Sequence, residues 1–580
     1  MKTKKFYNLI YSKKNNISFK DKNLFIGRWL NIKLLDKGKK NIEFYNHEWL
    51  NKKKQIKDFE KVKKIYVEVL NNLTSILNKY HSKNFNLRQW EIILFFFLYH
   101  YIPVAYDRWN MIKSIKKKYR LRPIELISYK SKNFECKNSL DVFDLVFSNE
   151  WNDWLISEII KKQELDYFDG KILKKKNIFK RKFQKKDSKK IFRFKNNNNK
   201  FFLMNLELPK IQKLKLNLRL NQINFFYDQP STHDIFSTSE RINKIKILQS
   251  SNNFVNFITE NIYKIMPRNF LENFKEIEKK INSLNWPKNP KVIMTSYSHF
   301  TDEVFCIYTA KKIKEGAKFV ILQHGHQGHH DFCGTYYEKR VCDKYLTWGN
   351  KSKDKKTIPL FVSTVIKKNI KKKNPSGILL KLTEFTLIPW KANHSPREIE
   401  GVTEYRNNLT NFLSNLEKKI KKKTTIKSYD FTNSNYVTKE IKKNFKEVKI
   451  NKFNRLIGRG YVEARDKNLI IETFNSTGFL ELLTMNSPVI LITTKNLFHI
   501  KKEYSRYYDS LIKNKIIFFD PKEAAKYINL IYLKIDEWWF EKKRQKAIEF
   551  FCENMCRFEK NQMKVLPKIL KKISNESKNV

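Results

Sequence analysis

Apolar residues follow two different periods along this chain. Over 50–125 and 140–165 they recur every three to four positions, which predicts helices. The longest apolar run, 92–106, contains His100 and Pro103 and is shorter than the roughly 20 residues that cross a membrane. We therefore expect a buried helix there, which Pro103 ends or kinks.

Short apolar runs replace this helical pattern in the second half of the chain. The runs 291–297 and 318–325 predict strands, and the segment 302–316 between them predicts a helix with Gly316 as its C-terminal cap. A strand, a helix and a second strand in succession are typical of a parallel sheet. The short run 342–349 would add a further strand to that sheet.

A second pattern of the same kind occupies the C-terminal region. Its predicted strands are 377–382, 468–473, 488–493 and 516–520, and its predicted helices are 403–421, 437–446, 476–486, 521–539 and the stretch to about 572. The Lys- and Asn-rich stretch 351–374 is the expected linker. The sequence therefore predicts an α/β protein with two Rossmann-like domains facing a cleft. They are a helix-rich domain at 1–350 and a domain with a helical tail at 375–580.

The chain is strongly basic, with 118 Lys and Arg residues against 58 Asp and Glu residues and a formal net charge of +60. The excess lies in lysine, beside much Asn, Ile and Phe, which AT-rich codons explain, so we expect a solvated basic surface. The stretch 171–220 holds 18 Lys and Arg residues against two acidic ones, and we expect an exposed insertion or a basic hairpin there. An anionic membrane surface is the alternative partner, and nucleic acid is not the partner that we expect.

The cysteines and the N-terminus indicate the compartment. Six cysteines, none of them in a C-x-x-C pair, predict neither a disulfide framework nor a zinc ribbon. The basic N-terminus lacks the apolar core of a signal peptide. We therefore expect a cytoplasmic protein, soluble or peripheral at the inner face of the membrane.

Glycine and histidine gather in one loop, although both are scarce in the chain. Five of the 13 glycines lie between Gly316 and Gly349, and four of the 11 histidines lie within 324–330. This loop follows the predicted strand 318–325. The carboxyl ends of such strands are where open α/β sheets bind ligands, so the loop is the first candidate site.

The residues of this loop suit an acceptor and a base. His324 is the candidate general base, because a histidine at a strand end can take a proton or bind a phosphate. Gly325 and Gly328 would let the backbone approach an acceptor closely. Gln323 and His326 complete the candidate acceptor loop. A solvent-facing or helix-capping role is the alternative for the histidines.

A second candidate site follows the predicted strand 468–473. Ser476 and Thr477 are candidate N-caps of the next helix. With Asn475 and Gly478 they would present hydroxyls and free amides to a diphosphate or a carboxylate. Plain capping of an ordinary helix is the alternative. The acidic candidates here, which would contact a ribose or a sugar, are Glu472 and Glu481.

The motifs that the sequence lacks narrow the chemistry. It contains no D-x-D, no P-loop, no G-x-G-x-x-G after a strand, no H-E-x-x-H and no G-x-S-x-G. We therefore expect no metal and no cofactor. Two α/β domains, one with a histidine loop and one with an anion-binding helix start, resemble the glycosyltransferase architecture called GT-B.

Several strings, in order, carry a more specific resemblance. They are RQWEIILFFFLYHYIPVAYDRW (88–109), SNEWNDWL (148–155), AKFVILQHGHQGHHDF (317–332), DKYLTWG (343–349), FNSTGFLELLTMNSPVILI (474–492) and the tail 507–539. Together they resemble a family of transferases from bacterial O-antigen and surface-polysaccharide loci. The family has a second glycine in the loop where this chain has His326, which puts an identical substrate in doubt.

The resemblance implies a glycosyltransferase that acts on a surface-polysaccharide acceptor, which can be lipid-linked. The expected donor is a nucleotide-activated sugar held by 475–478, and the expected base is His324. Arg108 would clamp an acidic group of the acceptor, or would form a structural ion pair with Asp107. A polyol-phosphate transferase on the same fold is the second hypothesis. A basic protein that binds nucleic acid or a membrane surface is the third.

Overall fold

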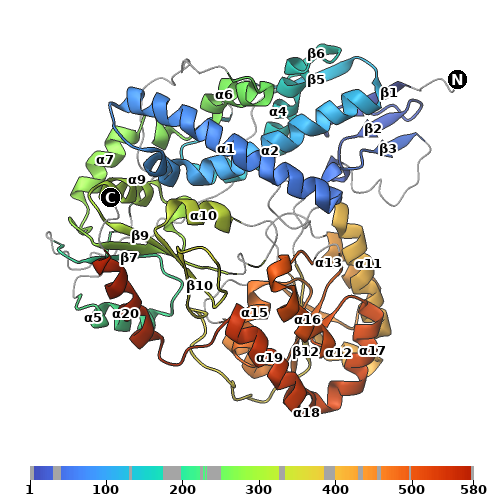
Figure 1. Ribbon diagram of the computed structural model, residues 1–580. Helices are drawn as coiled ribbons and strands as arrows, with labels where there is room; N and C mark the ends of the chain where they lie inside the picture. Colours follow the sequence, from blue (N-terminus) through green and yellow to red (C-terminus); the bar gives the residue numbers. More distant parts are fainter. Residues whose placement is uncertain are drawn as a thin grey trace.

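The structure is a computed structural model. It describes residues 6–30, 41–129, 134–173, 197–222, 226–228, 230, 250–325, 329, 334–383, 399–428, 436–452, 459–495 and 498–576. Two parallel sheets with helices around them form most of the molecule, and a helix-rich part lies over the first sheet (Figure 1). The predicted α/β class with two Rossmann-like sheets is thereby confirmed.

The N-terminal part combines helices with two small parallel sheets. Strands β1 (Phe6–Ile10), β2 (Asn23–Phe25), β3 (Ile42–Phe44) and β4 (Arg120–Leu121) pair in the order β3-β2-β1-β4, and β5 (Ile124–Ser128) pairs with β6 (Tyr167–Ile172). The helices are α1 (Lys52–His81), α2 (Leu87–Lys118), α3 (Ser139–Val146), α4 (Asn149–Lys162), α6 (Asn253–Ile265) and α7 (Phe274–Ser283).

Helix α2 is the centre of this part, and it continues past Pro103 to Lys118. Its apolar run is buried against α1, α3, α4 and α9 (Glu303–Lys314). The packing on all sides outweighs the hydrogen bond that proline removes, so the helix does not end where the sequence suggested. Within the described ranges, no helix is both long enough and apolar enough to cross a membrane.

The first large sheet has five strands, all parallel, in the order β11-β10-β9-β8-β7. They are β7 (Phe201–Met204), β8 (Val292–Thr295), β9 (Lys318–Leu322), β10 (Lys344–Thr347) and β11 (Thr357–Pro359). Helices α5 (Lys210–Arg219), α8 (Ser298–Thr301), α9 and α10 (Thr335–Val341) connect them. We call it the β7–β11 sheet.

Two stretches of this sheet differ from the sequence prediction. Strand β7 lies within 171–220, which we expected to be an exposed insertion, but all four of its residues are buried. Strand β11 lies within 351–374, the expected linker, and pairs with β10. The high lysine content around both strands conceals them, because β7 needs only four buried residues and β11 is a half-buried strand of three residues.

The second large sheet has six strands, all parallel, in the order β14-β13-β12-β15-β16-β17. They are β12 (Ile378–Lys381), β13 (Thr424–Ser428), β14 (Lys449–Lys452), β15 (Leu469–Glu472), β16 (Val489–Ile492) and β17 (Ile517–Phe518). Its helices are α11 (Ile399–Asn415), α12 (Lys418–Lys422), α13 (Tyr436–Asn444), α14 (Arg459–Asp466), α15 (Thr477–Thr484), α16 (Ser505–Lys513), α17 (Pro521–Ile531), α18 (Ile535–Trp539) and α19 (Lys542–Met555). We call it the β12–β17 sheet.

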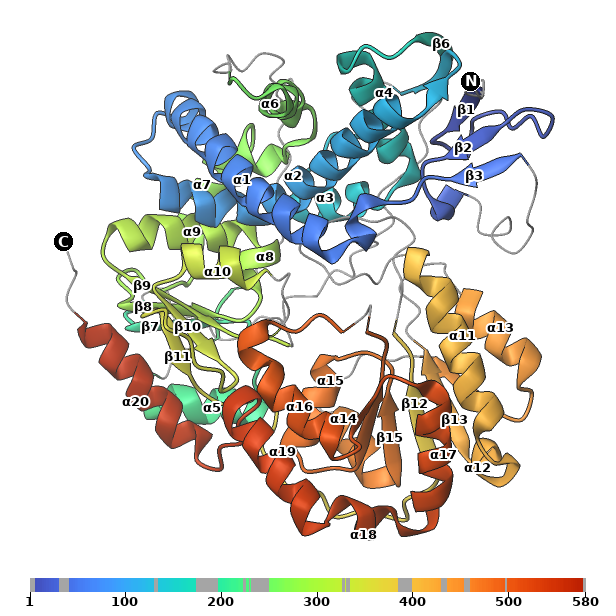
Figure 2. The same ribbon diagram turned by 45° about the vertical axis from the view of Figure 1, so that its right-hand side comes forward.

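The last helix, α20 (Gln562–Asn575), crosses back to the β7–β11 sheet (Figure 2). It lies beside α5 and against β8, and its residues Leu566, Leu570 and Ile573 join the apolar core on that face of the sheet. The sequence placed this helical tail with the domain at 375–580. The three leucine and isoleucine residues at helical spacing do not say which sheet they cover, so the sequence could not place the tail.

The two large sheets differ in winding. The β7–β11 sheet adds each new strand on the same side, whereas the β12–β17 sheet reverses direction between β12 and β15. Ligands of open α/β sheets bind outside the carboxyl ends of the strands at such a reversal. The end of β12 and the end of β15 therefore form the topologically favoured binding point of this fold.

Candidate functional site

Three neighbouring strands of the β7–β11 sheet are followed by polar residues that contact one another. Glu207 follows β7, Tyr297 follows β8 and His324 follows β9. The Tyr297 hydroxyl donates a 2.6 Å hydrogen bond to Glu207 Oε1, and its ring centroid lies 4.6 Å from that of His324. Tyr297 thus connects a carboxyl group with the predicted base.

Glu207 is a carboxyl group that titrates near neutral pH. Burial raises its pKa to about 7, hydrogen bonds from Tyr297 and the Gly325 backbone oppose that rise, and the charge of Glu481 adds to it. Proton transfer in catalysis is most efficient when the pKa of the side chain lies close to the working pH. Glu207 is therefore a second candidate for the base.

His324 lies in a buried group of polar side chains. Burial lowers its pKa to about 4, although the carboxylate of Glu338, 4.0 Å from Nδ1, opposes the fall. Glu338 is completely buried and binds His299 Nε2 at 3.0 Å and the Tyr345 hydroxyl at 3.2 Å. The imidazole of His324 is consequently neutral at pH 7, and a neutral imidazole can orient a hydroxyl group.

Gln323 fixes the turn that follows β9. Its Oε1 accepts a 2.9 Å hydrogen bond from the backbone amide of Trp348, and its Nε2 donates a 2.9 Å bond to the carbonyl of Gly325. Gly325 has φ +65°, a conformation that suits glycine. Gln323 therefore ties the end of β9 to the end of β10, and its side chain holds the backbone at Gly325.

The edges of the two large sheets meet at Gly325. A Cβ atom on this glycine would lie 2.7 Å from Oγ1 of Thr477, the first residue of α15. A second link is the Tyr508 hydroxyl, which lies 3.0 Å from His329 Nδ1 and accepts a 3.1 Å hydrogen bond from Asn475 Nδ2. The structure therefore brings together the two candidate sites that the sequence predicts about 150 residues apart.

Charged side chains pair with one another at the reversal of the β12–β17 sheet. Lys381 at the end of β12 has its Nζ 2.5 Å from Glu472 Oε1 at the end of β15 and 3.5 Å from Glu463 Oε2. The other oxygen of Glu472 accepts a 3.1 Å hydrogen bond from Ser476 Oγ. Glu472, which the sequence assigned to a ribose or a sugar, thus binds protein groups.

The start of α15 keeps unused hydrogen-bonding capacity. Ser476 Oγ accepts a 3.1 Å hydrogen bond from the Phe479 amide, so Ser476 is a true N-cap. The Gly478 amide at the second helical position has no acceptor within the described part of the chain. Asn475 is 1% exposed, and its Oδ1 has no hydrogen-bond partner among the residues described. The Gly478 amide could bind an anionic group of a ligand, and Asn475 Oδ1 could accept a hydrogen bond from the same ligand.

Glu481 connects the two edges electrostatically. Its Oε1 accepts a 2.5 Å hydrogen bond from Thr364 Oγ1. Burial raises its pKa, the Thr364 hydrogen bond and the charge of Lys381 oppose the rise, and the charge of Glu472 adds to it. It also contributes to the raised pKa of Glu207. The charge of Glu481 beside the β12–β17 sheet therefore affects the pKa of Glu207 at the edge of the β7–β11 sheet.

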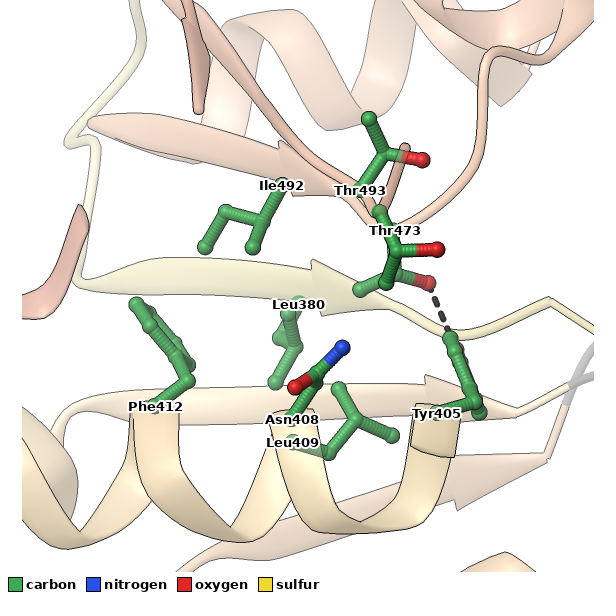
Figure 3. Close-up of a pocket in the computed structure, with 9 residues that line it drawn as sticks. Leu380, Tyr405, Asn408, Leu409, Phe412, Thr473, Ile492 and Thr493 are labelled. Atoms are coloured by element: carbon green, nitrogen blue, oxygen red, sulfur yellow. Dashed lines mark hydrogen bonds between the residues drawn. The ribbon is translucent and has the colours of Figure 1, made fainter. Parts of the chain in front are cut away.

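A small apolar hollow lies on the α11 side of the same strand ends (Figure 3). It is lined by Leu380, Tyr405, Asn408, Leu409, Phe412, Thr473, Ile492, Thr493 and Thr494. The Tyr405 hydroxyl lies 2.6 Å from Thr473 Oγ1. Hydroxyl groups thus border an apolar recess beside the reversal of the sheet.

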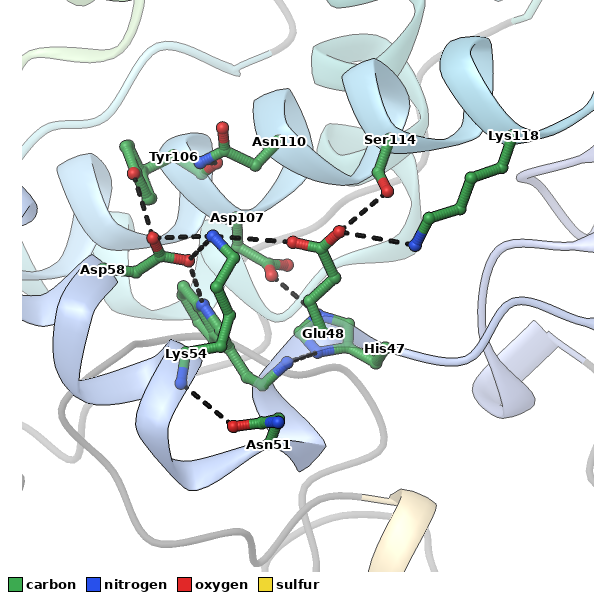
Figure 4. A network of polar contacts seen from close by, with 11 residues as sticks. His47, Glu48, Asn51, Lys54, Asp58, Tyr106, Asp107, Asn110, Ser114 and Lys118 are labelled. Atoms are coloured by element: carbon green, nitrogen blue, oxygen red, sulfur yellow. Dashed lines mark hydrogen bonds and ion pairs between the residues drawn. The ribbon is translucent and has the colours of Figure 1, made fainter.

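Arg108 lies away from these strand ends. It is completely buried in α2, pairs with Asp107, and donates a 3.0 Å hydrogen bond to Asn152 Oδ1. His47 Nε2 lies 2.7 Å from Asp107 (Figure 4), and together with Arg108 it keeps the pKa of Asp107 low, although burial alone would raise it. The structure thus shows the structural ion pair of Arg108 with Asp107.

Two predicted loop residues, His326 and Gly328, lie outside the described residues. Among the residues that are described, no three His, Cys, Asp or Glu side chains come together as a metal site.

The family model described as "LIC12162 family transferase" matches residues 8–570. This chain belongs to the LIC12162 family of transferases. It is accordingly an enzyme of the transferase class. A comparison with curated proteins finds no match.

Solved structures with partial likeness to this LIC12162 family transferase include glycosyltransferases. A complex of an S. aureus TarM mutant with fondaparinux, α-GlcNAc-glycerol and UDP has 14% identity and a TM-score of 0.31, over 49% of this chain and 55% of TarM. Acinetobacter baumannii MurG has 10% identity and a TM-score of 0.29, over 52% of this chain and 78% of MurG. Spinosyn forosaminyltransferase SpnP has 8% identity and a TM-score of 0.28, over 52% of this chain and 79% of SpnP.

Sequence reasoning missed two charged residues of the candidate site, Glu207 and Lys381. Glu207 is one of only two acidic residues in the basic stretch 171–220, and this isolation was a usable signal. Lys381 is one of 118 basic residues, and only its place at the end of a buried strand distinguishes it. Sequence composition alone does not single out such a residue.

Proposed function

We propose that this transferase is a glycosyltransferase, which moves a sugar from a nucleotide-activated donor to an acceptor of the surface-polysaccharide type without a metal. The observation that carries the proposal is the approach of Gly325 to Thr477. This approach puts the acid–base groups of one sheet beside the helix start of the other. A group transfer between two bound substrates needs such a two-part site.

In this proposal the donor binds at the carboxyl ends of β12 and β15. The free amide of Gly478 and the dipole of α15 would hold the diphosphate, with the cation of Lys381 close behind. A Cβ atom on Gly478 would lie 2.7 Å from Lys381 Nζ and 2.8 Å from Glu472 Oε1, so glycine lets this ion pair lie against the start of α15. The same positive groups would stabilise the nucleoside diphosphate as it leaves.

The acceptor belongs at the edge of the β7–β11 sheet. Glu207 would take the proton of the acceptor hydroxyl as its oxygen bonds to the anomeric carbon of the donor. The bond from that carbon to the donor phosphate breaks, and the nucleoside diphosphate leaves with the electron pair. His324, predicted from the sequence as the base, stays neutral because burial lowers its pKa to about 4, and in this proposal it orients the hydroxyl.

The proposal is tested by the product of the purified enzyme. A panel of nucleotide sugars is incubated with a polysaccharide acceptor in the presence of EDTA, and nucleoside diphosphate release and the product mass are measured. We expect one donor to give a glycosylated acceptor without added metal. A new phosphodiester signal in the phosphorus NMR spectrum of the product would instead show polyol-phosphate transfer.

A further inference from the structure

Helix α5 carries an apolar stripe on its outer face. Its inner face, Leu216 with the following Leu220, is buried against the β7–β11 sheet. On the opposite face Ile211, Leu214 and Leu218 recur at three- and four-residue spacing and are 52%, 39% and 57% exposed. A helix that is apolar on both faces needs a second apolar surface against its outer face.

The surroundings of this stripe are basic. Helix α20 packs beside α5 on the same face of the sheet (Figures 1 and 2). Neither helix contains an acidic residue, and the exposed cations of the pair are Lys210, Lys215, Arg219, Lys564, Lys568, Lys571 and Lys572. In the described part of the chain none of these cations has an ion-pair partner. We call this surface the α5–α20 face.

We propose that the α5–α20 face docks on an anionic lipid bilayer. An apolar stripe that is flanked by lysines is the pattern of a helix lying in the membrane interface. Ile211, Leu214 and Leu218 would enter the boundary between headgroups and acyl chains, while the lysine side chains reach the lipid phosphates. This inference stands on surface residues alone and does not depend on the proposed donor or acceptor.

The charge distribution argues against two other occupants. A second copy of the chain would bring one lysine-rich face against another, and like charges across an interface are unfavourable. A nucleic acid would use the cations but would leave the exposed apolar stripe without a role. The bilayer is the partner that satisfies both features at once.

The test is sedimentation of the full chain with vesicles of phosphatidylcholine, alone or with about 30% phosphatidylglycerol. We expect at least about tenfold stronger binding to the anionic vesicles. This binding should weaken when salt rises from about 0.1 M to about 1 M, which shortens the Debye length from about 10 Å to about 3 Å.

Two variants divide the surface into its parts. The triple variant Ile211→Ser, Leu214→Ser, Leu218→Ser and the quadruple variant Lys564→Gln, Lys568→Gln, Lys571→Gln, Lys572→Gln should each lose about tenfold or more in vesicle binding. The matched control is Leu530→Ser with Leu533→Ser, two leucines that are 73% and 87% exposed, one in α17 and one in the turn that follows it. That control should bind as the wild type does.

Thermal unfolding of each variant reports whether it folds. If the triple variant does not fold, vesicle binding by the quadruple variant tests the proposal. Equal binding to neutral and anionic vesicles would overturn the proposal. So would an equal loss in the control, or vesicle binding that survives in both variants of the face. Salt-sensitive binding to nucleic acid that the triple variant retains, with no vesicle binding, would assign the cations to a polynucleotide.

Discussion

The two large sheets present opposite kinds of chemistry at the edges that meet. The β7–β11 sheet winds in one direction, and its edge carries Glu207 and His324. Burial raises the pKa of Glu207 to about 7 and lowers the pKa of His324 to about 4. The β12–β17 sheet, which reverses, ends in Lys381 and Glu472, a closely paired couple beside a helix start. The difference suggests that one edge moves protons while the other holds a ligand.

The largest effect should come from removing the titratable carboxyl of the first edge. Glu207→Gln should lower kcat by about 10²–10⁴-fold, the usual contribution of a general base. In the wild type kcat/KM should rise with pH through about 7, because Glu207 must lose its proton to act, and the variant should lack this limb. Steady-state kinetics from about pH 5 to pH 9 measure both.

Stability gives an independent reading of the same group. The folded state holds the Glu207 proton up to about pH 7, whereas the ordinary value is 4.5, so this group should make the protein less stable as pH rises through that window. Glu207→Gln should flatten that part of the stability curve. Glu315→Gln, an exposed glutamate at the end of α9, is the control and should change neither curve. A normal rate in Glu207→Gln would end its role as the base.

Changes to the ion pair at the edge of the β12–β17 sheet should lower the stability of the protein. Glu472→Gln removes the nearest partner of the buried Lys381 and should cost about 3 kcal/mol, the lower end of the range for breaking a buried pair. Urea unfolding measures this cost. The double variant Lys381→Met, Glu472→Leu removes both charges and should lose less than the single variant. If both lose the same amount, the pair is not coupled as the distances indicate.

The contact between the edges is tested by a side chain at the glycine. Gly325→Ala should cost about 1–2 kcal/mol for a non-glycine residue at positive φ, plus the clash with Thr477 Oγ1. Adding Thr477→Ala should restore the steric part of this loss. Urea unfolding of the four proteins of the cycle measures the coupling, and strictly additive losses would show that the two edges do not touch.

The smallest effect separates a cap from a ligand. Ser476→Ala should lower stability by about 1 kcal/mol, because its hydroxyl caps α15. Since that hydroxyl already binds Phe479 and Glu472, the affinity for a nucleotide should stay the same. Calorimetric titration measures the affinity for the nucleotide. A clear loss of binding at wild-type stability would show that Ser476 contacts the ligand.

The sequence predicted the elements of the two sheets better than their connections. The apolar runs at 318–325 and 488–493 became β9 and β16, because a buried parallel strand is readable as a short apolar run. The strand at 201–204 was missed because lysines surround it. The destination of α20 depends on a long-range contact that no local pattern encodes.

The site was predictable in outline and not in detail. Clustering of glycine and histidine found the loop at Gly325, and helix-start residues found 475–478. The role of Arg108 was not settled by sequence, because only burial distinguishes a clamp from an internal ion pair. Likewise, the pKa of Glu207 depends on neighbours from three strand ends, which only the fold brings together.

The central claim is that the reversal of the β12–β17 sheet binds the nucleotide and the other edge does not. Calorimetric titration of nucleoside diphosphates in EDTA, with wild type, Glu207→Gln and Asn475→Leu, tests it most directly. We expect one nucleoside diphosphate to bind wild type and Glu207→Gln equally, and at least about tenfold more weakly to a folded Asn475→Leu. Binding that Glu207→Gln loses and Asn475→Leu keeps, or no binding of any nucleoside diphosphate, would contradict the account.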